Sequence, residues 1–396
     1  MKKSLLVFAV FLVFLSMGFG DAAGQLVSIV ENAFSVSPFM ASFVSFSGMI
    51  MFGLLSVPMG VQQSKIGKKK MLVIGLILFL LGAILPILAL SFPIVLIAVL
   101  LMGAGATILQ VSGNPLMRDV SPEGRYSSNL SFAQSVKAIG ALSTSLILAI
   151  VGTKLINKSW FTLNTVKGTA DVSFRILFPV FAGVLLITLI CVLLFVPNKY
   201  ENEEKTEPTT VKKCIGALKN PFILMMFLGI FFYCGAEASM FNRIPSILMT
   251  NNPNIPPTLG NIILIIALFL GRFLGGLVLR KIDAKSFLLI TVFISIIGNV
   301  LLFFPYTTIL SFIFIGIGFA NIFPLIFSIA IEHQPELTNE ISGLMTTAIV
   351  GAAIVPVITG LAANAGPKYA FIVTLACLIY LTIVSLRLLK TRKIEN

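Results

Sequence analysis

One long uncharged run decides the fold. From Met71 to Ser91 the chain reads MLVIGLILFLLGAILPILALS, 21 residues without a charged side chain. A helix rises about 1.5 Å per residue, so about 20 apolar residues cross the roughly 30 Å hydrocarbon core of a bilayer. The run therefore predicts a membrane-spanning helix.

The composition extends this prediction to the whole chain. Of the 396 residues, 57% are hydrophobic and 11% are charged, whereas about 25% are charged in an ordinary soluble domain. A water-soluble fold cannot hide that much apolar surface, but a lipid-facing surface can. The net charge of +13 lies in short clusters between apolar runs, a pattern typical of membrane-protein loops and not of a nucleic-acid-binding surface.

Eleven further apolar runs predict an all-α membrane protein with twelve transmembrane helices. Six precede a charged segment at 198–220, and six follow it. We expect an N-terminal six-helix bundle over 1–197, a cytoplasmic linker over 198–220 and a C-terminal six-helix bundle over 221–396. The expected spans are 4–30, 38–62, 71–91, 93–117, 128–152, 174–197, 221–249, 257–279, 286–304, 307–331, 341–364 and 369–386.

The distribution of Lys and Arg predicts the orientation. With the N-terminus inside, twenty basic residues fall on inside segments. Five fall on outside segments: Lys154, Lys158, Lys167, Arg175 and Lys368. Because Lys and Arg are enriched in cytoplasmic loops, we expect both termini and the linker to be cytoplasmic, in the plasma (inner) membrane.

An internal repeat indicates two related halves. The sequence Gly60-Val-Gln-Gln-Ser-Lys-Ile-Gly-Lys68 has a counterpart 216 residues later, Gly276-Leu-Val-Leu-Arg-Lys-Ile-Asp-Ala284. The fourth and tenth spans also share a Gly-x-Gly followed by a proline, at Pro115 and Pro324. Two pseudo-symmetric six-helix bundles that rock about a bound solute are the architecture of major facilitator transporters.

Several motifs carry a resemblance to a family. The loop from Gly60 to Lys69 resembles the major facilitator signature, with Ser64 where an acidic residue is usual. Four further segments resemble the fucose and glucose/galactose cation symporters. These are Leu109-Gln-Val-Ser-Gly-Asn-Pro115, Asn129-Leu-Ser-Phe-Ala-Gln-Ser-Val-Lys-Ala-Ile-Gly140, Tyr233-Cys-Gly-Ala-Glu-Ala-Ser-Met240 and Asn321-Ile-Phe-Pro-Leu-Ile-Phe327. The resemblance implies a secondary active transporter that takes up a sugar by alternating access.

Polar side chains inside the spans are the candidate substrate site. Amides both donate and accept hydrogen bonds, which suits a hydroxyl-rich solute. Gln25 lies one helical turn after the acidic Asp21, and the resemblance implies a sugar contact at the position of Gln134. The predicted substrate-binding residues are Gln25, Gln110, Asn114, Gln134, Lys137 and Asn321.

The ionisable groups within spans are candidates for ion coupling. A charge at the bilayer centre costs about 2.5–3.5 kcal/mol, so each needs a partner or a watery cavity. We predict that Asp21 and Glu237 couple protons and that Lys137 is a charge partner that also contacts substrate. The alternatives are a structural Asp21–Lys137 ion pair and a structural helix contact for Glu237. Arg243 and Arg272 are interpreted as structural.

These features together predict a proton-coupled sugar symporter, with sodium as the alternative ion. Lys137 keeps open an importer or exporter of an organic anion such as a sugar acid. A membrane receptor is the rival from another class. We find no nucleotide-binding, nucleophile or metal motif, and we therefore expect no enzyme activity, cofactor or metal. The expected partners are the solute, the coupling cation and membrane lipids, for a monomer.

Overall fold

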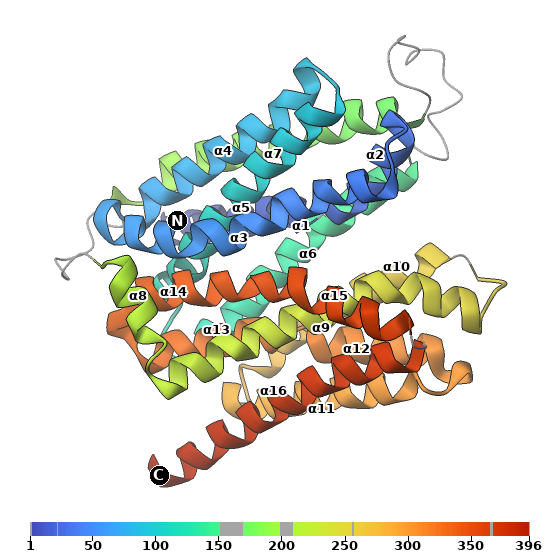
Figure 1. The fold of residues 1–396 in the computed structure, drawn as a ribbon. Coiled ribbons are helices and arrows are strands. Elements are labelled where there is room, and N and C mark those ends of the chain that lie inside the picture. The colour runs from blue at the N-terminus through green and yellow to red at the C-terminus, as the bar shows by residue number, and fades with distance from the viewer. Residues whose placement is uncertain are drawn as a thin grey trace. The chain divides into compact units, whose positions relative to one another are not determined.

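The structure is a computed structural model that describes residues 2–21, 23–150, 169–198, 209–255, 257–364 and 367–395. These residues form sixteen α-helices and three short 3-10 turns (Figure 1). The helices before the linker are α1 (Lys2–Asp21), α2 (Ala23–Phe34), α3 (Pro38–Ile66), α4 (Lys68–Leu88), α5 (Phe92–Val120), α6 (Tyr126–Ile150) and α7 (Thr169–Phe195).

The second half of the chain begins with a short helix in the expected linker. The helices there are α8 (Val211–Ala217), α9 (Pro221–Asn251), α10 (Pro257–Val278), α11 (Ala284–Leu301), α12 (Thr308–Phe319), α13 (Ile322–His333), α14 (Thr338–Thr347), α15 (Gly351–Asn364) and α16 (Pro367–Glu395). The 3-10 turns are η4 (Pro305–Thr307), η5 (Pro335–Leu337) and η6 (Ala348–Val350).

The helices lie at the twelve expected spans. Within the described residues, ten helical stretches are long and apolar enough to cross a membrane. The other two spans correspond to α1, whose apolar part Ser4–Gly20 is shorter, and to α6, which carries Lys137. The all-α fold class predicted from hydropathy is therefore confirmed.

Two spans expected as single helices are interrupted. The tenth span contains α12 and α13, separated at Ala320 and Asn321, and the eleventh contains α14, η6 and α15. Gly351 follows η6, and a Cβ there would overlap the carbonyl oxygen of Phe231 on α9. The interruption and the glycine together let the two backbones approach closely. Hydropathy alone could not reveal either interruption, because every residue involved is uncharged.

The chain folds into two compact units. Unit 1 comprises Met1–Leu116 and Val136–Thr209, and unit 2 comprises Met117–Ser135 and Thr210–Asn396. The boundaries thus fall inside α5, inside α6 and between Thr209 and Thr210. The predicted division at the linker concerns the two sequence repeats and stays a prediction.

The segment Met117–Ser135 belongs to unit 2 because polar contacts bind it there. The Ser127 and Ser328 hydroxyl oxygens lie 2.7 Å apart, and the Ser128 hydroxyl donates to the Gly276 carbonyl at 2.6 Å. Phe132 packs edge-on against Phe273 at 5.6 Å. The start of α6 therefore packs against α10 and α13.

Small residues bring the helices of unit 1 into close contact. A Cβ at Gly18 of α1 would overlap the carbonyl oxygen of Lys137 on α6, and a Cβ at Gly140 would overlap the carbonyl of Leu15. Glycines let membrane helices approach until their backbones touch. This contact fixes the height and rotation of α6, and hence the position of Lys137.

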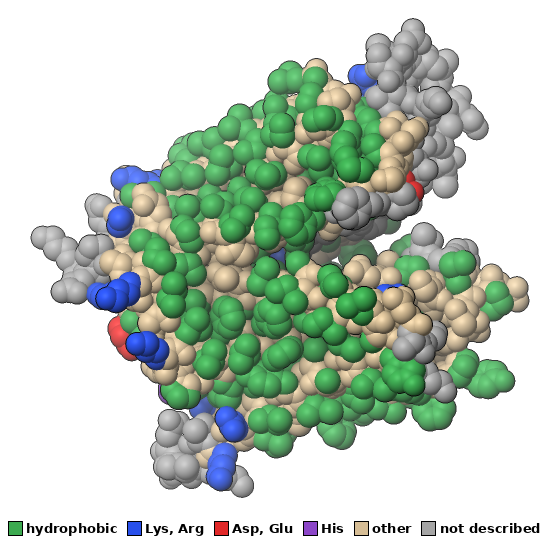
Figure 2. Space-filling view, in the orientation of Figure 1, with side chains coloured by type: hydrophobic (Ala, Val, Ile, Leu, Met, Phe, Trp, Pro, Cys, Tyr) green, Lys and Arg blue, Asp and Glu red, His purple; other side chains and the backbone are tan. Residues whose placement is uncertain are grey.

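The surface matches a lipid environment. Large apolar side chains such as Leu54, Leu194, Phe293 and Leu361 are more than half exposed. Figure 2 shows hydrophobic side chains covering the visible faces, with most visible Lys and Arg side chains near one end of the helices. This distribution agrees with a multi-pass membrane protein.

Cysteine labelling can test the predicted orientation. Natural Cys214 is buried, whereas its neighbour Lys213 is exposed. In a variant lacking the natural cysteines, we expect Lys213→Cys to react with an impermeant maleimide only after the cells are permeabilised. Tyr306→Cys, at a fully exposed position between α11 and α12, is the matched control and should react in intact cells. The reverse labelling pattern would show that the predicted orientation is wrong.

Candidate functional site

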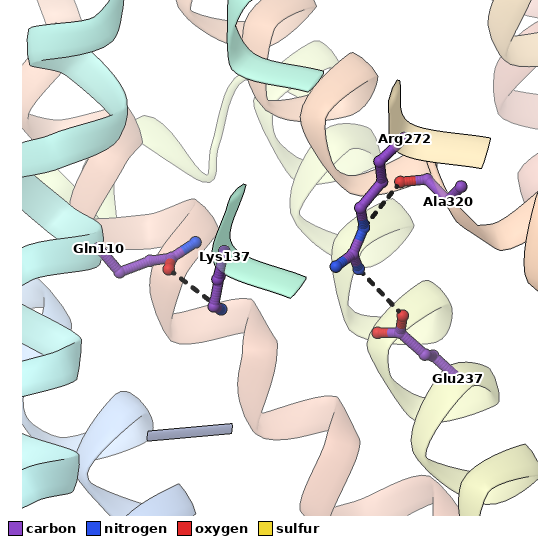
Figure 3. Close-up of polar contacts among 5 residues, drawn as sticks. All are labelled: Gln110, Lys137, Glu237, Arg272 and Ala320. Carbon is purple, nitrogen blue, oxygen red and sulfur yellow. Dashed lines mark hydrogen bonds and ion pairs between the residues drawn. The ribbon is translucent and has the colours of Figure 1, made fainter. Parts of the chain in front are cut away.

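In unit 1, α5 and α6 bring together two of the predicted site residues. The Lys137 ammonium donates to Gln110 Oε1 at 3.5 Å (Figure 3). Both side chains are buried, with Gln110 1% and Lys137 9% exposed. A buried cation therefore faces an amide oxygen, an arrangement that can contact a polar solute through the remaining donors of both groups.

Asn114 extends this polar patch along α5. It lies four residues after Gln110, and residues at this spacing share one face of a helix. Its side chain is fully buried. Pro115 follows within the continuous helix α5. Gln110, Asn114 and Lys137 thus all belong to unit 1.

Two predicted site residues lie outside the described side chains. These are Asp21, at the end of α1, and Gln25, in the first turn of α2. Their predicted roles in coupling and in substrate binding stay predictions.

In unit 2, Glu237 and Arg272 form an ion pair that we did not predict. Arg272 Nη2 on α10 lies 3.4 Å from Glu237 Oε1 on α9 (Figure 3). The side chains are 13% and 21% exposed, respectively. Arg272 Nε also donates to the carbonyl of Ala320 at 3.2 Å. Removing one partner of such a pair leaves an uncompensated charge, which costs more than replacing both.

The sequence contained part of the signal for this pair. Glu237 is the acidic residue within a span of the second half, and Arg243 and Arg272 are its basic counterparts. Opposite charges on consecutive spans indicate an ion pair. Which of the two arginines pairs with Glu237 depends on how α9 and α10 are rotated about their axes, and the sequence does not reveal this rotation.

Asn321 and Gln134 are buried amides of unit 2, and each has a hydrogen-bonding atom that is not used. Asn321 Nδ2 donates to the Gly271 carbonyl at 2.7 Å. Within the described residues, Asn321 Oδ1 and Gln134 Nε2 have no hydrogen-bond partner. Both side chains are at most 3% exposed. Buried polar atoms are rarely left unsatisfied, so these two atoms can accept from and donate to a bound solute.

A separate cavity in unit 1 is apolar. It has a volume of only about 10 Å³ and is lined by residues that include Leu26, Met49, Phe52, Val99 and Met102. None of the predicted polar site residues lines it. Hydroxyl groups would find no partners there, so we do not assign the solute to this cavity.

Ser64 replaces the acidic residue of the signature loop without a loss of contact. Its hydroxyl donates to the Val61 carbonyl at 2.7 Å and accepts from the Thr209 amide at 3.2 Å. The loop is thus tied to the end of the linker through a neutral hydrogen bond.

Membrane-spanning helices that bury amides and ionisable groups define a polytopic membrane transporter. The Major Facilitator Superfamily is matched over residues 6–349. The chain belongs to this superfamily and is a transporter, not an enzyme.

Curated relatives cover most of the chain. A glucose/galactose transporter of Brucella abortus is 28% identical in an alignment of 380 positions that covers 91% of this chain and 88% of the relative. A putative glucose/galactose transporter of Helicobacter pylori is 27% identical, over 94% of each chain. The L-fucose-proton symporter of Escherichia coli is 20% identical, over 85% of this chain and 81% of its own.

Solved structures share the fold. The major facilitator transporter FucP in its outward conformation has a TM-score of 0.82 at 18% identity, covering 97% of this chain and 99% of FucP. The proton:xylose symporter XylE has a TM-score of 0.77 at 15% identity, covering 98% and 95%. The prediction of a major facilitator fold is confirmed.

A double-mutant cycle can measure the Glu237–Arg272 pair. We expect Glu237→Gln to lower the thermal-unfolding midpoint by several degrees, because removing one partner of a buried pair costs about 3–5 kcal/mol. The double variant Glu237→Gln with Arg272→Gln should lower the unfolding midpoint by less than the sum of the decreases in the two single variants. Arg243→Gln combined with Glu237→Gln is the matched control and should be additive. Additivity in both combinations would contradict the pair.

Proposed function

We propose that this chain is a proton-coupled symporter that takes up a sugar across the plasma membrane by alternating access. Similarity to relatives named glucose/galactose transporters over about nine tenths of the chain carries the proposal. Similarity to an L-fucose-proton symporter supports proton as the coupling ion. Sodium is the alternative ion.

The chemistry of the buried side chains is consistent with a sugar. Gln110 and Asn114 in unit 1, and Gln134 and Asn321 in unit 2, supply amide donors and acceptors. Sugar hydroxyls need both kinds of group. We propose that these residues, with Gln25 and Lys137, face the solute during transport by a monomer with cytoplasmic termini.

Two carboxylates are the proposed proton carriers, Asp21 and Glu237. A carboxylate that alternates between a basic partner and a dry surrounding changes its proton affinity. The contact between Glu237 and Arg272 supplies the basic partner in unit 2. A conformational change that separates the two groups would therefore favour proton uptake by Glu237.

Uptake into proteoliposomes tests both function and coupling. For one proton per sugar, a pH difference of about one unit corresponds to about 1.4 kcal/mol and permits about tenfold accumulation. We expect the wild type to approach this ratio with glucose, galactose or fucose. Asp21→Asn and Glu237→Gln should equilibrate sugar without accumulating it, while retaining exchange.

Glu123→Gln is the matched control, because Glu123 is an exposed carboxylate in the α5–α6 loop. It should accumulate sugar like the wild type. Full accumulation by both the Asp21 and the Glu237 variants would exclude them as essential proton carriers. Accumulation driven only by a sodium gradient would show that sodium, and not the proton, is the coupling ion.

The substrate charge is a separate question, raised by the buried cation at Lys137. A sugar acid is the alternative substrate because its carboxylate could bind the ammonium that contacts Gln110. For a neutral sugar, we expect Lys137→Gln to change the binding midpoint less than about tenfold. For a sugar acid, loss of a charge-assisted bond of about 1.5–3 kcal/mol would weaken binding at least tenfold. Thermal-shift titration with neutral and acidic sugars measures this difference, with Lys281→Gln as an exposed control.

A further inference from the structure

The break between α12 and α13 leaves a backbone carbonyl without its helical donor. In a regular helix the amide of residue 324 would donate to the carbonyl of Ala320. Residue 324 is proline, which has no N–H. An unpaired carbonyl at membrane depth costs several kcal/mol. Arg272 Nε takes the place of the missing donor at 3.2 Å.

A second hydrogen bond runs in the opposite direction between the same segments. Asn321 Nδ2 donates to the carbonyl of Gly271, the residue before Arg272, at 2.7 Å. Glycine at 271 and 275 makes room for this approach, because a Cβ at either position would overlap Ala320 or Asn321. The break in the tenth span is therefore held by α10 as well as by its own backbone bonds, from Ala320 N–H to the Gly316 carbonyl and from Leu325 N–H to the Asn321 carbonyl.

The other end of Arg272 contacts an ionisable group. Glu237 Oε1 on α9 lies 3.4 Å from Nη2, so a single guanidinium bridges a carboxylate and the Ala320 carbonyl (Figure 3). Tyr233, one turn before Glu237, packs edge-on against Phe319, the last residue of α12, at 5.9 Å. The face of α9 that carries Glu237 thus also contacts the end of α12.

Tyr233 lies on this face of α9 beside Glu237, and Arg272 contacts the face from α10. The elements α12, α15 and η6, which also pack against α9, contain no ionisable side chain. Among the side chains that the structure describes, the remaining ionisable groups on α9 and on the elements packed against it are Cys234, Arg243, Glu332, His333, Glu340, Tyr369, Cys377, Tyr380, Arg387 and Lys390.

We propose that Arg272 is a positioning residue that transmits the charge state of Glu237 to the break between α12 and α13. The inference rests on the proposed role of Glu237 in proton coupling. With Glu237 ionised, the guanidinium is held at both ends and the break is fixed. When Glu237 takes up a proton, its charge-assisted bond to Arg272 is lost, and the bridge to Ala320 loosens. Asn321, a proposed substrate-binding residue, lies in the same break and moves with it.

Amide hydrogen exchange of residues 320–326, in nanodiscs without substrate or gradient, tests the proposal. After correction for the intrinsic chemical rate, the wild type should exchange faster as the pH falls and Glu237 becomes protonated. While Glu237 is ionised in the wild type, Glu237→Gln should exchange about tenfold faster, as expected for loss of one charge-assisted bond, and the two should converge as the pH falls. It should also abolish the extra pH dependence, an effect that a merely structural contact would not produce.

Substitutions at Arg272 and Pro324 separate positioning from general destabilisation. Arg272→Gln should raise exchange of the break as Glu237→Gln does, and Arg272→Lys should restore part of the protection by keeping the positive charge. Pro324→Ala returns the missing N–H, so Arg272→Gln with Pro324→Ala should exchange more slowly than Arg272→Gln alone. Arg243→Gln is the matched control and should leave this segment unchanged.

The outcome is independent of which solute is transported. Exchange that follows the charge of Glu237 supports the proposal even if none of the sugars tested is taken up. Exchange of residues 320–326 that is the same in the wild type, Glu237→Gln and Arg272→Gln would overturn it, even if proton-driven sugar uptake is observed. The proposal is also overturned if exchange of this segment in the wild type shows no pH dependence beyond that of the intrinsic chemical rate.

Discussion

The hydrocarbon core of a membrane offers no water to pair with a polar group, and this constraint shapes every feature of the protein. It requires helices, because only a helix satisfies its own backbone within one segment. It also makes each interruption conspicuous. Where the tenth span breaks at Ala320 and Asn321, Arg272 of α10 supplies the donor that the helix lacks, and the Asn321 side chain bonds the break to α10. The same constraint pairs Glu237 with Arg272 and brings Lys137 to an amide oxygen.

How much of the fold could be predicted follows from the same physics. Spans can be read from hydropathy because an apolar run of about 20 residues has few other stable environments. The positions of all twelve spans were predictable for this reason. The breaks in the tenth and eleventh spans were not, since Pro324 lies inside an apolar run and other prolines, such as Pro115, occur within continuous helices. A proline removes a donor wherever it occurs, but neighbouring helices decide whether the helix then separates.

The candidate site was partly predictable. Ionisable residues in spans are costly, so Lys137 and Glu237 could be identified from the sequence as sites that need partners. Gln110 and Lys137 were both predicted to bind substrate, but the contact between them was not predicted. The bond from Glu237 to Arg272 could not be derived, because it depends on how α9 and α10 are rotated about their axes. Arg272 was interpreted as structural, and the geometry gives it contacts with both a carboxylate and a broken helix.

The fourth and tenth spans contain similar residues but differ in structure. The fourth and tenth spans each combine a Gly-x-Gly with an asparagine and a proline, at Asn114 and Pro115 and at Asn321 and Pro324. In α5 the asparagine directly precedes the proline and the helix continues to Val120. In the tenth span the asparagine lies three residues before the proline, next to the carbonyl that the proline leaves without its helical donor. There Asn321 can bond α10 through its amide while Arg272 bonds Ala320. A shift of two residues therefore gives one half a continuous helix and the other a break whose hydrogen bonds depend on an ionisable neighbour.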